Sequence, residues 1–315
     1  MITVLAGGVG GARFINGLVR VVEPKEITVI VNVGDDLDWL GLHVCPDLDT
    51  ITYTLGGVVN PANQWGRAAE QFTVRDELAR FAYPDWFTLG DRDLALHLHR
   101  SRLLRDGLPL SAVTATITAA FGIGVRLLPA TDDPVETRIT TTDGADLHFQ
   151  EYWVRDRARG EVTNVRLKGA ATATPAPGVL DALMHTDAII FAPSNPVVSI
   201  GTILTIPGVR DAVKRSLAPV VGVSPIISGN VVRGMADRLL PAVNTAVSAD
   251  GVAALYAGLI DGWVIDDADA HLVDTINATG ITAIATDTVM DTPERAALLA
   301  QRCLELADYV AQTSA

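Results

Sequence analysis

The sequence predicts an α/β fold: an open, mainly parallel sheet with helices on its faces and a small antiparallel β insertion. Short apolar runs of strand length alternate along the chain with segments of helical periodicity, which is typical of βαβ units. The glycines at 7–11 directly follow the first apolar run, as in Rossmann-like sheets that bind ligands beyond the ends of their strands. We expect a single large α/β domain over residues 1–315.

The N-terminal third contains two predicted strands and four predicted helices. Ile2–Ala6 and Ile27–Val33 are apolar and rich in β-branched residues, so we expect buried strands there. The last of the four helices starts at Ser111, a residue type that favours the N-cap position. Helical spacing of apolar residues predicts these helices at Ala12–Val21, Arg75–Phe81, Arg92–Leu104 and Ser111–Phe121.

The middle of the chain has a different pattern. Val125–Leu128, Glu136–Thr142 and Leu147–Arg155 are short runs rich in β-branched or aromatic residues. An Asp-Gly pair at 143–144 separates the second run from the third, and this pair is typical of a hairpin turn. We therefore expect an antiparallel insertion, or subdomain, over residues 125–170.

The α/β alternation resumes after this insertion. Thr292, Pro293 and Glu294 form a helix-start signal, with a capping hydroxyl, a proline at the first helical position and a carboxylate in the first turn. The remaining predicted elements are strands at Ala188–Ala192, Pro219–Val223, Gly262–Asp266 and Ile281–Ala285, and helices at Pro207–Ser216 and Pro293–Val310.

The composition excludes several classes of protein. With 24 Lys and Arg against 37 Asp and Glu, the formal net charge is −13, so we expect no nucleic-acid partner and no membrane partner. Apolar residues make up 49% of the chain, which excludes intrinsic disorder. The two cysteines, Cys45 and Cys303, are too few for a disulfide framework. We expect a cytoplasmic protein without a signal peptide or membrane span.

The glycine-rich segment is the first candidate binding site. Gly8, Gly10 and Gly11 would let the backbone approach an anion at a helix start, where free N–H groups and the positive end of the dipole lie. Arg13 stands where a dinucleotide fingerprint has its third glycine, and its guanidinium suits a phosphate or diphosphate. A plain tight turn is the alternative, but the arginine favours anion binding.

Two acidic pairs follow the second predicted strand. Asp35 or Asp36 could bind a hard cation, hold a ribose hydroxyl or be a solvated turn residue. Asp47 and Asp49 precede an apolar helical run, so one of them is expected to be an N-cap. The other could bind a metal ion or accept a proton.

Asp91 and Arg92 open another predicted helix. Asp91 is acceptable as an N-cap, whereas Arg92 opposes the helix dipole and is a weak indication of an anion nearby. His97 and His99 are two residues apart and point to different faces of that helix, so we expect both to be structural or surface residues.

Polar loops follow two of the later strands. The segment with Ser194 and Asn195, and the segment with Ser224, contain prolines that continue neither a strand nor a helix cleanly. They place hydroxyls, an amide and backbone N–H groups at one edge of the sheet. Several such loops together would form a ligand crevice, and we expect Gly8, Asp49 and Ser194 to share it.

Nine segments together carry a resemblance to a known family. They are GGVGGARF at 7–14, VNVGDD at 31–36, CPDLDT at 45–50, LGDRD at 89–93, LLPATDDPVET at 127–137, HFQEYWVR at 148–155, APSNPVVSIG at 192–201, SPIISG at 224–229 and GMAD at 234–237. The segments keep their order over nearly the whole chain, which makes the set highly specific. Together they resemble the 2-phospho-L-lactate transferases of coenzyme F-420 biosynthesis, and within them the actinobacterial branch, the phosphoenolpyruvate transferases.

The resemblance implies an enzyme that joins Fo, a riboflavin-like deazaflavin, to a phosphorylated three-carbon acid. The donor would be a guanosine diphosphate adduct of that acid, either lactyl or enolpyruvyl. The primary hydroxyl of the ribityl chain of Fo would attack the phosphorus bearing the acid, and GMP would leave. Mg²⁺ is the expected cofactor, and a homodimer is expected by resemblance alone.

The motif positions also give expected roles. Asp49, Asp36 and Asp91 are the candidate catalytic residues, whereas Asp47 is expected to be structural. We expect Asp49→Asn to leave the melting temperature almost unchanged and to lower turnover about a hundredfold or more. Donor binding is expected at Gly8, Gly10, Gly11, Arg13, Ser194, Asn195 and Ser224, acceptor binding at Asp49, Thr88, Asp91 and Arg92, and metal binding at Asp35, Asp36 and Asp49.

Two other functions remain as alternatives. An NAD(P)-dependent oxidoreductase would use the glycine segment, but the missing third glycine is evidence against it. A nucleotide-binding regulator, similar to the related gluconeogenesis factor, would not need the segments at 45–50 and 89–93. The sequence does not identify the three-carbon acid.

Overall fold

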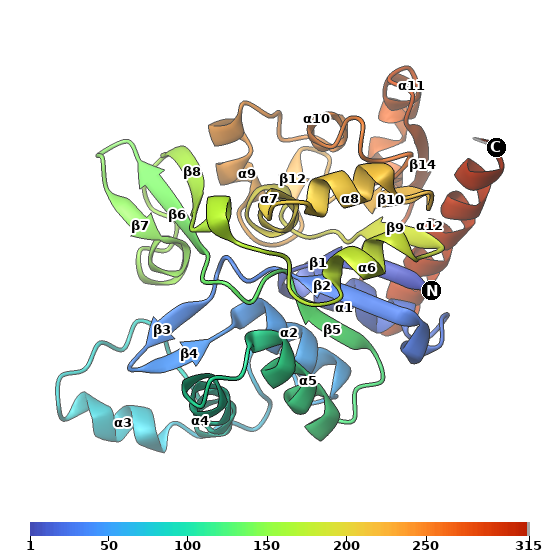
Figure 1. Ribbon diagram of the computed structural model, residues 1–315. Coiled ribbons are helices and arrows are strands. Elements are labelled where there is room, and N and C mark those ends of the chain that lie inside the picture. Colours follow the sequence, from blue (N-terminus) through green and yellow to red (C-terminus); the bar gives the residue numbers. More distant parts are fainter. Residues whose placement is uncertain (314–315) are drawn as a thin grey trace.

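The computed structural model describes residues 1–313, and the central element within them is a seven-stranded sheet (Figure 1). Each pair of neighbouring strands in it is parallel. This arrangement confirms the predicted fold class. In sheet order the strands are β14 (Thr282–Thr286), β13 (Gly262–Asp266), β10 (Val220–Val223), β9 (Ala188–Phe191), β1 (Ile2–Ala6), β2 (Ile27–Val31) and β5 (Arg126–Pro129).

The strand order reverses next to β1. The chain leaves β1 toward β2 and β5, returns to β9 on the other side of β1 and continues to β14. In open α/β sheets, ligands bind in the crevice beyond the carboxyl ends of the strands at such a reversal. All residues of β2, β9 and β10 are buried, as expected for parallel strands with helices on both faces.

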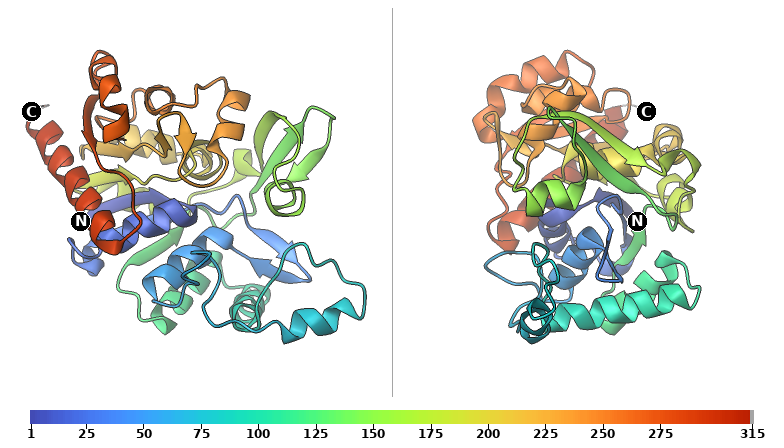
Figure 2. Two further views of the ribbon diagram at one scale, coloured as in Figure 1. Left: turned by 180° about the vertical axis from the view of Figure 1, so that it is seen from behind. Right: turned by 90° about the vertical axis from the view of Figure 1, so that its left-hand side faces the viewer.

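Helices cover both faces of the sheet. α1 packs against α12, and a Cβ atom on Gly17 would lie 2.3 Å from the Ala296 carbonyl carbon, so glycine permits this contact (Figure 2). The Thr3 hydroxyl donates to the Ala182 carbonyl of α6 at 2.9 Å. The helices are α1 (Gly8–Leu18), α2 (Pro46–Leu55), α3 (Thr73–Ala79), α4 (Asp91–Arg105), α5 (Leu110–Ala120), α6 (Val179–Met184), α7 (Gly201–Thr205), α8 (Val209–Arg215), α9 (Ala236–Leu239), α10 (Ala249–Leu255), α11 (Val273–Asn277) and α12 (Pro293–Thr313).

The antiparallel insertion is shorter than predicted. Its sheet has the order β7-β6-β8 and consists of β6 (Glu136–Thr141), β7 (Asp146–His148) and β8 (Val162–Lys168). The predicted first run of the insertion instead forms β5, which pairs in parallel with β2 at the edge of the main sheet. Its residues Leu127 and Leu128 are both buried, and a covered sheet accommodates such a run better than a hairpin with one wet face.

The predicted third run of the insertion is only partly a strand. Glu151–Arg155 form a π-helical turn instead. Glu151 accepts a hydrogen bond from the His148 N–H at 2.9 Å and pairs with Arg155, four residues later, at 2.7 Å. Pairing at this spacing stabilises a helical turn and outweighs the strand propensity of the aromatic residues.

Element ends differ from the prediction at some positions. β2 ends at Val31 rather than Val33, and α1 begins at Gly8 rather than Ala12, because the glycines form its first turn. Ser111 does not cap α5: Pro109 is the N-cap, and the Ser111 N–H and hydroxyl donate to Asp132 at 2.6 and 2.8 Å.

Three smaller observations complete the fold. Thr292 caps α12 as predicted, because its hydroxyl accepts from the Arg295 N–H at 3.2 Å. Of residues 1–313, no single helix is both long and apolar enough to cross a membrane, and one bent helix pair passes that test only when taken together. Two short hairpins remain, β3 (Leu37–Trp39) with β4 (Leu42–Val44) and β11 (Ile226–Ile227) with β12 (Asn230–Val231).

Candidate functional site

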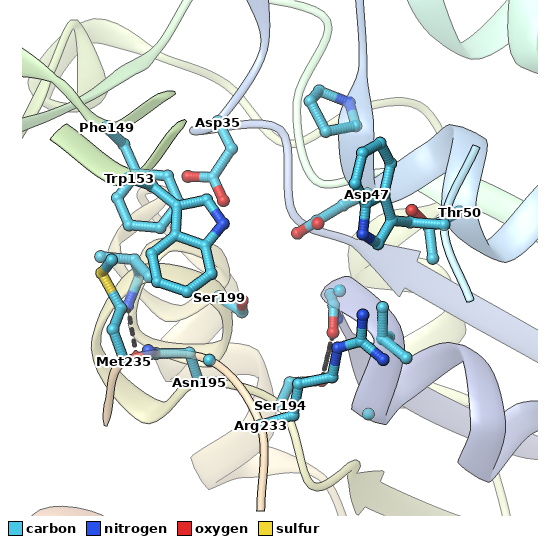
Figure 3. A pocket seen from close by; sticks show the side chains of 18 of the residues that line it. Asp35, Asp47, Thr50, Phe149, Trp153, Ser194, Asn195, Ser199, Arg233 and Met235 are labelled. Carbon is cyan, nitrogen blue, oxygen red and sulfur yellow. Dashed lines mark hydrogen bonds between the residues drawn. The ribbon is translucent and has the colours of Figure 1, made fainter. Parts of the chain in front are cut away.

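A cavity of about 490 Å³ opens beyond the carboxyl ends of β1, β9 and β10. The glycine segment, the loops after β9 and β10, the start of α2 and the insertion meet around it (Figure 3). Gly8, Asp49 and Ser194 lie in its wall together, as predicted. The predicted site residues that line it are Gly8, Gly10, Arg13, Asp35, Asp49, Thr88, Ser194, Asn195 and Ser224.

The glycine segment places the N-terminus of α1 at the cavity. Gly8 has a φ of +62°, which glycine adopts without strain. A Cβ atom on Gly10 would lie 2.3 Å from the Pro193 carbonyl oxygen, so only glycine allows this approach. The Ser194 hydroxyl accepts from the Gly7 N–H at 3.0 Å and donates to the Gly7 carbonyl at 2.8 Å. The first turn of α1 contains no acidic residue of its own; the Asp47 carboxylate accepts a backbone hydrogen bond from Gly8 there, and the remaining N–H groups, at the positive end of the helix dipole, can take an anion.

Asp35 and Asp47 place two buried carboxyl groups on the cavity wall, and Figure 3 shows them facing one another. The Asn32 amide donates to Asp47 at 2.8 Å, whereas one buried oxygen of Asp35 has no hydrogen-bond partner within residues 1–313. Burial raises the pKa of Asp47 to about 6. Burial and the charges of Asp47 and Asp36 raise the pKa of Asp35 well above its usual range. Such a pair can hold a divalent cation through oxygen atoms.

Asp49 lies in the first turn of α2, where a buried ion pair holds it. Arg100 is 2% exposed and donates to both carboxylate oxygens of Asp49, from Nη1 at 3.0 Å and from Nη2. Burial is the largest influence and lowers the pKa of Arg100, but the negative charges around it, that of Asp49 first, and its hydrogen bonds with Asp49 together outweigh burial and raise it. The prediction that Asp47 or Asp49 caps this helix is wrong, because Cys45 holds the N-cap position. Because Arg100 binds Asp49 and not Asp47, the carboxylate of Asp47 is more available to a ligand.

Asp36 and Gly11 are predicted site residues that lie outside the cavity lining of the described chain. The carboxylate of Asp36 is directed toward His43, with 3.4 Å between Oδ2 and the imidazole Nε2. Adjacent residues beyond a strand end point to different sides, and here Asp35 takes the cavity side. The predicted metal set of Asp35, Asp36 and Asp49 thus does not converge on one point. Gly11 is buried inside α1.

Asp91 and Arg92 also lie away from the cavity within the described part of the chain. The Asp91 carboxylate accepts from the backbone N–H groups of Thr73 and Val74, both at 3.2 Å, and so it caps α3. The Arg92 N–H donates to Glu70 at 2.8 Å. Glu70 also accepts from the Asp93 N–H at 2.8 Å, so it supplies negative charge at the N-terminus of α4.

The insertion supplies an aromatic wall that sequence reasoning missed. Phe149 and Trp153 both line the cavity (Figure 3), and so does Gln150, which lies between them in sequence. Trp153 belongs to the π-helical turn, a local structure that is frequent at functional sites. The signal was present as aromatic residues in the segment 148–155, but its position in the fold could not be predicted from spacing.

A second arginine was also missed. Arg233 lines the cavity just before the GMAD segment, and burial together with the charge of Arg233 lowers the pKa of Arg13. Arg13 donates to the Gln64 side chain and Arg233 to the Asn63 carbonyl, so both reach the same loop. Two guanidinium groups that repel one another would be neutralised by an anion such as a diphosphate.

Comparisons with known proteins agree with this geometry. Residues 2–302 match the family described as 2-phospho-L-lactate transferase CofD. A phosphoenolpyruvate transferase from Streptomyces griseus is 51% identical over 314 residues, which cover 98% of this chain and 99% of that protein. Another from Kitasatospora aureofaciens is 51% identical over 315 residues, covering 98% of each chain. One from Nocardia farcinica is 45% identical, covering 97% of this chain and 94% of that one.

A solved structure supports the fold. A crystal structure of protein BH3568 from Bacillus halodurans covers 96% of this chain and 98% of its own, with a TM-score of 0.62 and 17% identity. A second crystal structure of the same protein, titled as a member of the upf0052 family, has a TM-score of 0.65. At this identity the likeness shows the fold alone. The match over residues 2–302 and relatives half identical over their whole length show that this chain belongs to the 2-phospho-L-lactate transferase CofD family and is a transferase.

Proposed function

We propose that this transferase moves a phosphoenolpyruvyl group from its guanosine diphosphate adduct to the primary ribityl hydroxyl of Fo, 7,8-didemethyl-8-hydroxy-5-deazariboflavin. The products are dehydro-coenzyme F-420-0 and GMP. One observation carries the proposal: a single cavity joins a glycine-rich helix N-terminus, two buried carboxyl groups and an aromatic wall. Relatives about half identical to this chain are named phosphoenolpyruvate transferases, which supports the enolpyruvyl donor over the 2-phospho-L-lactyl donor.

The donor diphosphate belongs at the N-terminus of α1. The N–H groups that Asp47 does not engage and the positive dipole end would meet the phosphate oxygens there, because Gly8 and Gly10 carry no side chain to block the approach. Arg13 and Arg233 bring charge-assisted hydrogen bonds from the side. Ser194, whose hydroxyl holds the Gly7 backbone, keeps this helix start in place.

Asp35 and Asp47 would hold Mg²⁺. The partnerless buried oxygen of Asp35 and the raised pKa of Asp47 both indicate carboxyl groups that are unsatisfied without a cation. When bound, Mg²⁺ neutralises charge on the two phosphates of the donor. A cation held by the two carboxylates would also account for the binding of a polyanion by a chain with net charge −13.

The flat ring of the acceptor belongs against Phe149 and Trp153. The ribityl oxygen then forms a bond to the phosphorus that carries the three-carbon acid, and the bond from this phosphorus to the bridging oxygen of GMP breaks. GMP leaves with the electron pair of that bond, and a carboxylate of the Asp35–Asp47 pair takes the hydroxyl proton. Phosphoryl transfer needs mainly positioning and charge neutralisation, which the cavity offers.

Incubation of the purified chain with Fo, the enolpyruvyl donor and Mg²⁺, followed by mass spectrometry, tests the proposal. We expect dehydro-coenzyme F-420-0 and GMP in equal amounts, and a product two hydrogens heavier if the lactyl donor is used instead. Asp47→Ala should abolish both products, whereas Asp308→Ala, on the exposed side of α12, should not. Binding of donor without any turnover would favour the nucleotide-binding regulator, and hydride transfer with NAD(P) would favour the oxidoreductase.

A further inference from the structure

Three different donor groups meet at the β3–β4 hairpin, and the residues that carry them do not line the cavity of the described chain. Ligand atoms of Asp36, His43 and Cys45 all lie within 4.8 Å of one another. Asp36 directly precedes β3, His43 lies in β4, and Cys45 follows β4 as the N-cap of α2. A single hairpin therefore presents a carboxylate, an imidazole and a thiol to one point.

The contacts of His43 place its ring as in a metal-binding histidine. His43 Nε2 lies 3.4 Å from Asp36 Oδ2, and the other ring nitrogen, Nδ1, lies 3.4 Å from Asp38 Oδ1. A second carboxylate on the far ring nitrogen is the usual way in which proteins orient a metal-binding histidine. The other oxygen of Asp36 is buried and has no hydrogen-bond partner among the described residues, and Asp36 as a whole is 9% exposed. This oxygen is an independent sign of a missing ligand.

The charges around the cluster also suit a divalent cation. Arg100 lies nearby, but it donates to both oxygens of Asp49, so its charge is already matched. With Cys45 as a thiolate, the two anionic ligands, Cys45 and Asp36, together carry a charge of −2. A dication balances this charge, and the thiol proton is released on binding.

We propose that Asp36, His43 and Cys45 form a zinc site separate from the transfer cavity. A thiolate and an imidazole select Zn²⁺ over Mg²⁺, which prefers oxygen ligands alone. Three protein ligands leave the fourth tetrahedral position for water, and the His43 side chain is 31% exposed, so solvent reaches the site. The ion ties the hairpin to the start of α2 and thereby fixes the turn that carries Asp47. This inference does not depend on the proposed transfer reaction.

Metal content tests the site without any activity assay. Bound metal is removed from the full chain with a chelator, and the chain is then dialysed against micromolar Zn²⁺ in the presence of millimolar Mg²⁺. The bound zinc is quantified by inductively coupled plasma mass spectrometry. We expect one Zn²⁺ per chain and a higher melting temperature with zinc. Cobalt(II) bound in place of zinc should show the intense charge-transfer absorption of a cobalt–thiolate bond.

Variants locate the ion. Cys45→Ser and His43→Ala should lose the bound zinc and the zinc-dependent rise in melting temperature. Cys303→Ser removes the other buried cysteine, and His99→Ala removes another histidine, so both controls should keep one zinc per chain. The cobalt spectrum of the unaltered chain gives an answer even if a variant fails to fold. No zinc under these conditions, a cobalt spectrum without thiolate absorption, or equal zinc in Cys45→Ser and Cys303→Ser would each overturn the proposal and leave an Asp36–His43 ion pair.

Discussion

Asp47 stands at a position where a carboxylate destabilises the ligand-free fold. Burial raises its pKa from 3.8 to about 6, so the folded state binds this proton more tightly than the unfolded state. The stability that Asp47 contributes is fully present below its unfolded pKa and is lost as the pH rises through 6. Because one pKa unit corresponds to about 1.4 kcal/mol, the loss above this range is at most about 3 kcal/mol.

We therefore expect Asp47→Asn to raise the free energy of unfolding at pH 8 by about 1 to 3 kcal/mol in metal-free buffer. Asparagine keeps an acceptor for the Asn32 amide but avoids the buried charge. Urea denaturation at pH 8 and pH 5 measures the effect, and the difference from the unaltered chain should shrink at the lower pH. Asp308→Asn, on an exposed face of α12, is the control and should change little. A less stable Asp47→Asn at pH 8 would contradict burial as the cause.

Asp49 carries the opposite expectation. Asp49→Asn leaves the Arg100 guanidinium buried without a counter-charge, so we expect the free energy of unfolding to fall by about 3 to 5 kcal/mol. The sequence alone predicts that Asp49→Asn hardly changes the melting temperature, and the ion pair with Arg100 is the reason for the difference. The double variant with Arg100→Met should recover part of the loss. If Asp49→Asn alone melts like the unaltered chain, this pair does not stabilise the fold.

At the scale of elements, α1 depends on its close contact with the loop after β9. In Gly10→Ala the new Cβ would stand 2.3 Å from the Pro193 carbonyl oxygen, so either α1 or the loop must shift. We expect the dissociation constant for GDP, measured by calorimetry, to rise at least tenfold, because the N–H groups of the helix start move from the phosphates. Gly124→Ala, whose Cβ would meet only the Pro24 side chain at 3.1 Å, is the matched control and should bind GDP normally.

A further prediction concerns Trp153 in the π-helical turn of the insertion. Trp153→Ala removes an exposed indole from the aromatic wall, so we expect the KM for Fo to rise by about tenfold or more while kcat changes little. Steady-state kinetics with Fo varied at saturating donor measures both constants. Tyr309→Ala, an exposed aromatic residue on α12, should leave both unchanged. If kcat instead fell about tenfold and KM did not change, the acceptor would not bind against Trp153.

Local sequence patterns predict the helices and strands well, but they predict contacts between residues far apart in the chain less well. The strands at Ile2–Ala6 and Gly262–Asp266 were predicted with the observed bounds. A parallel strand covered by helices on both faces is a short, continuous apolar run, and such runs are easy to recognise in a sequence. The switch of Val125–Leu128 from the insertion to β5 could not be predicted, since both places accept an apolar run. Arg100 was missed for a similar reason: its partner Asp49 lies 51 residues away, and no spacing rule links the two.

The whole molecule brings the cavity together from segments that are far apart in the chain. The glycine segment, the start of α2, the insertion and the loops after β9 and β10 all end at the reversal of strand order beside β1. Parallel strands point their carboxyl ends the same way, so each added βα unit delivers one more loop to the same edge. The segments that line the cavity are therefore spread along the chain in a fixed order, and this order identifies the family more specifically than any single motif does.

The charge of the whole molecule sets how fast a nucleotide reaches that cavity. The net charge of −13 repels a polyanion, while the carboxylates of Asp35 and Asp47 offset the guanidinium groups of Arg13 and Arg233 locally. Salt screens the long-range repulsion, since the Debye length falls from about 30 Å at 0.01 M to about 8 Å at 0.15 M.

We therefore expect the association rate constant of metal-free GDP, followed by stopped-flow fluorescence, to rise severalfold over that range of NaCl. With saturating Mg²⁺ the dependence should flatten, because the cation neutralises both the ligand and the two carboxylates. A rate constant that instead falls steeply with salt would show that the two arginines, and not the net charge, govern the approach.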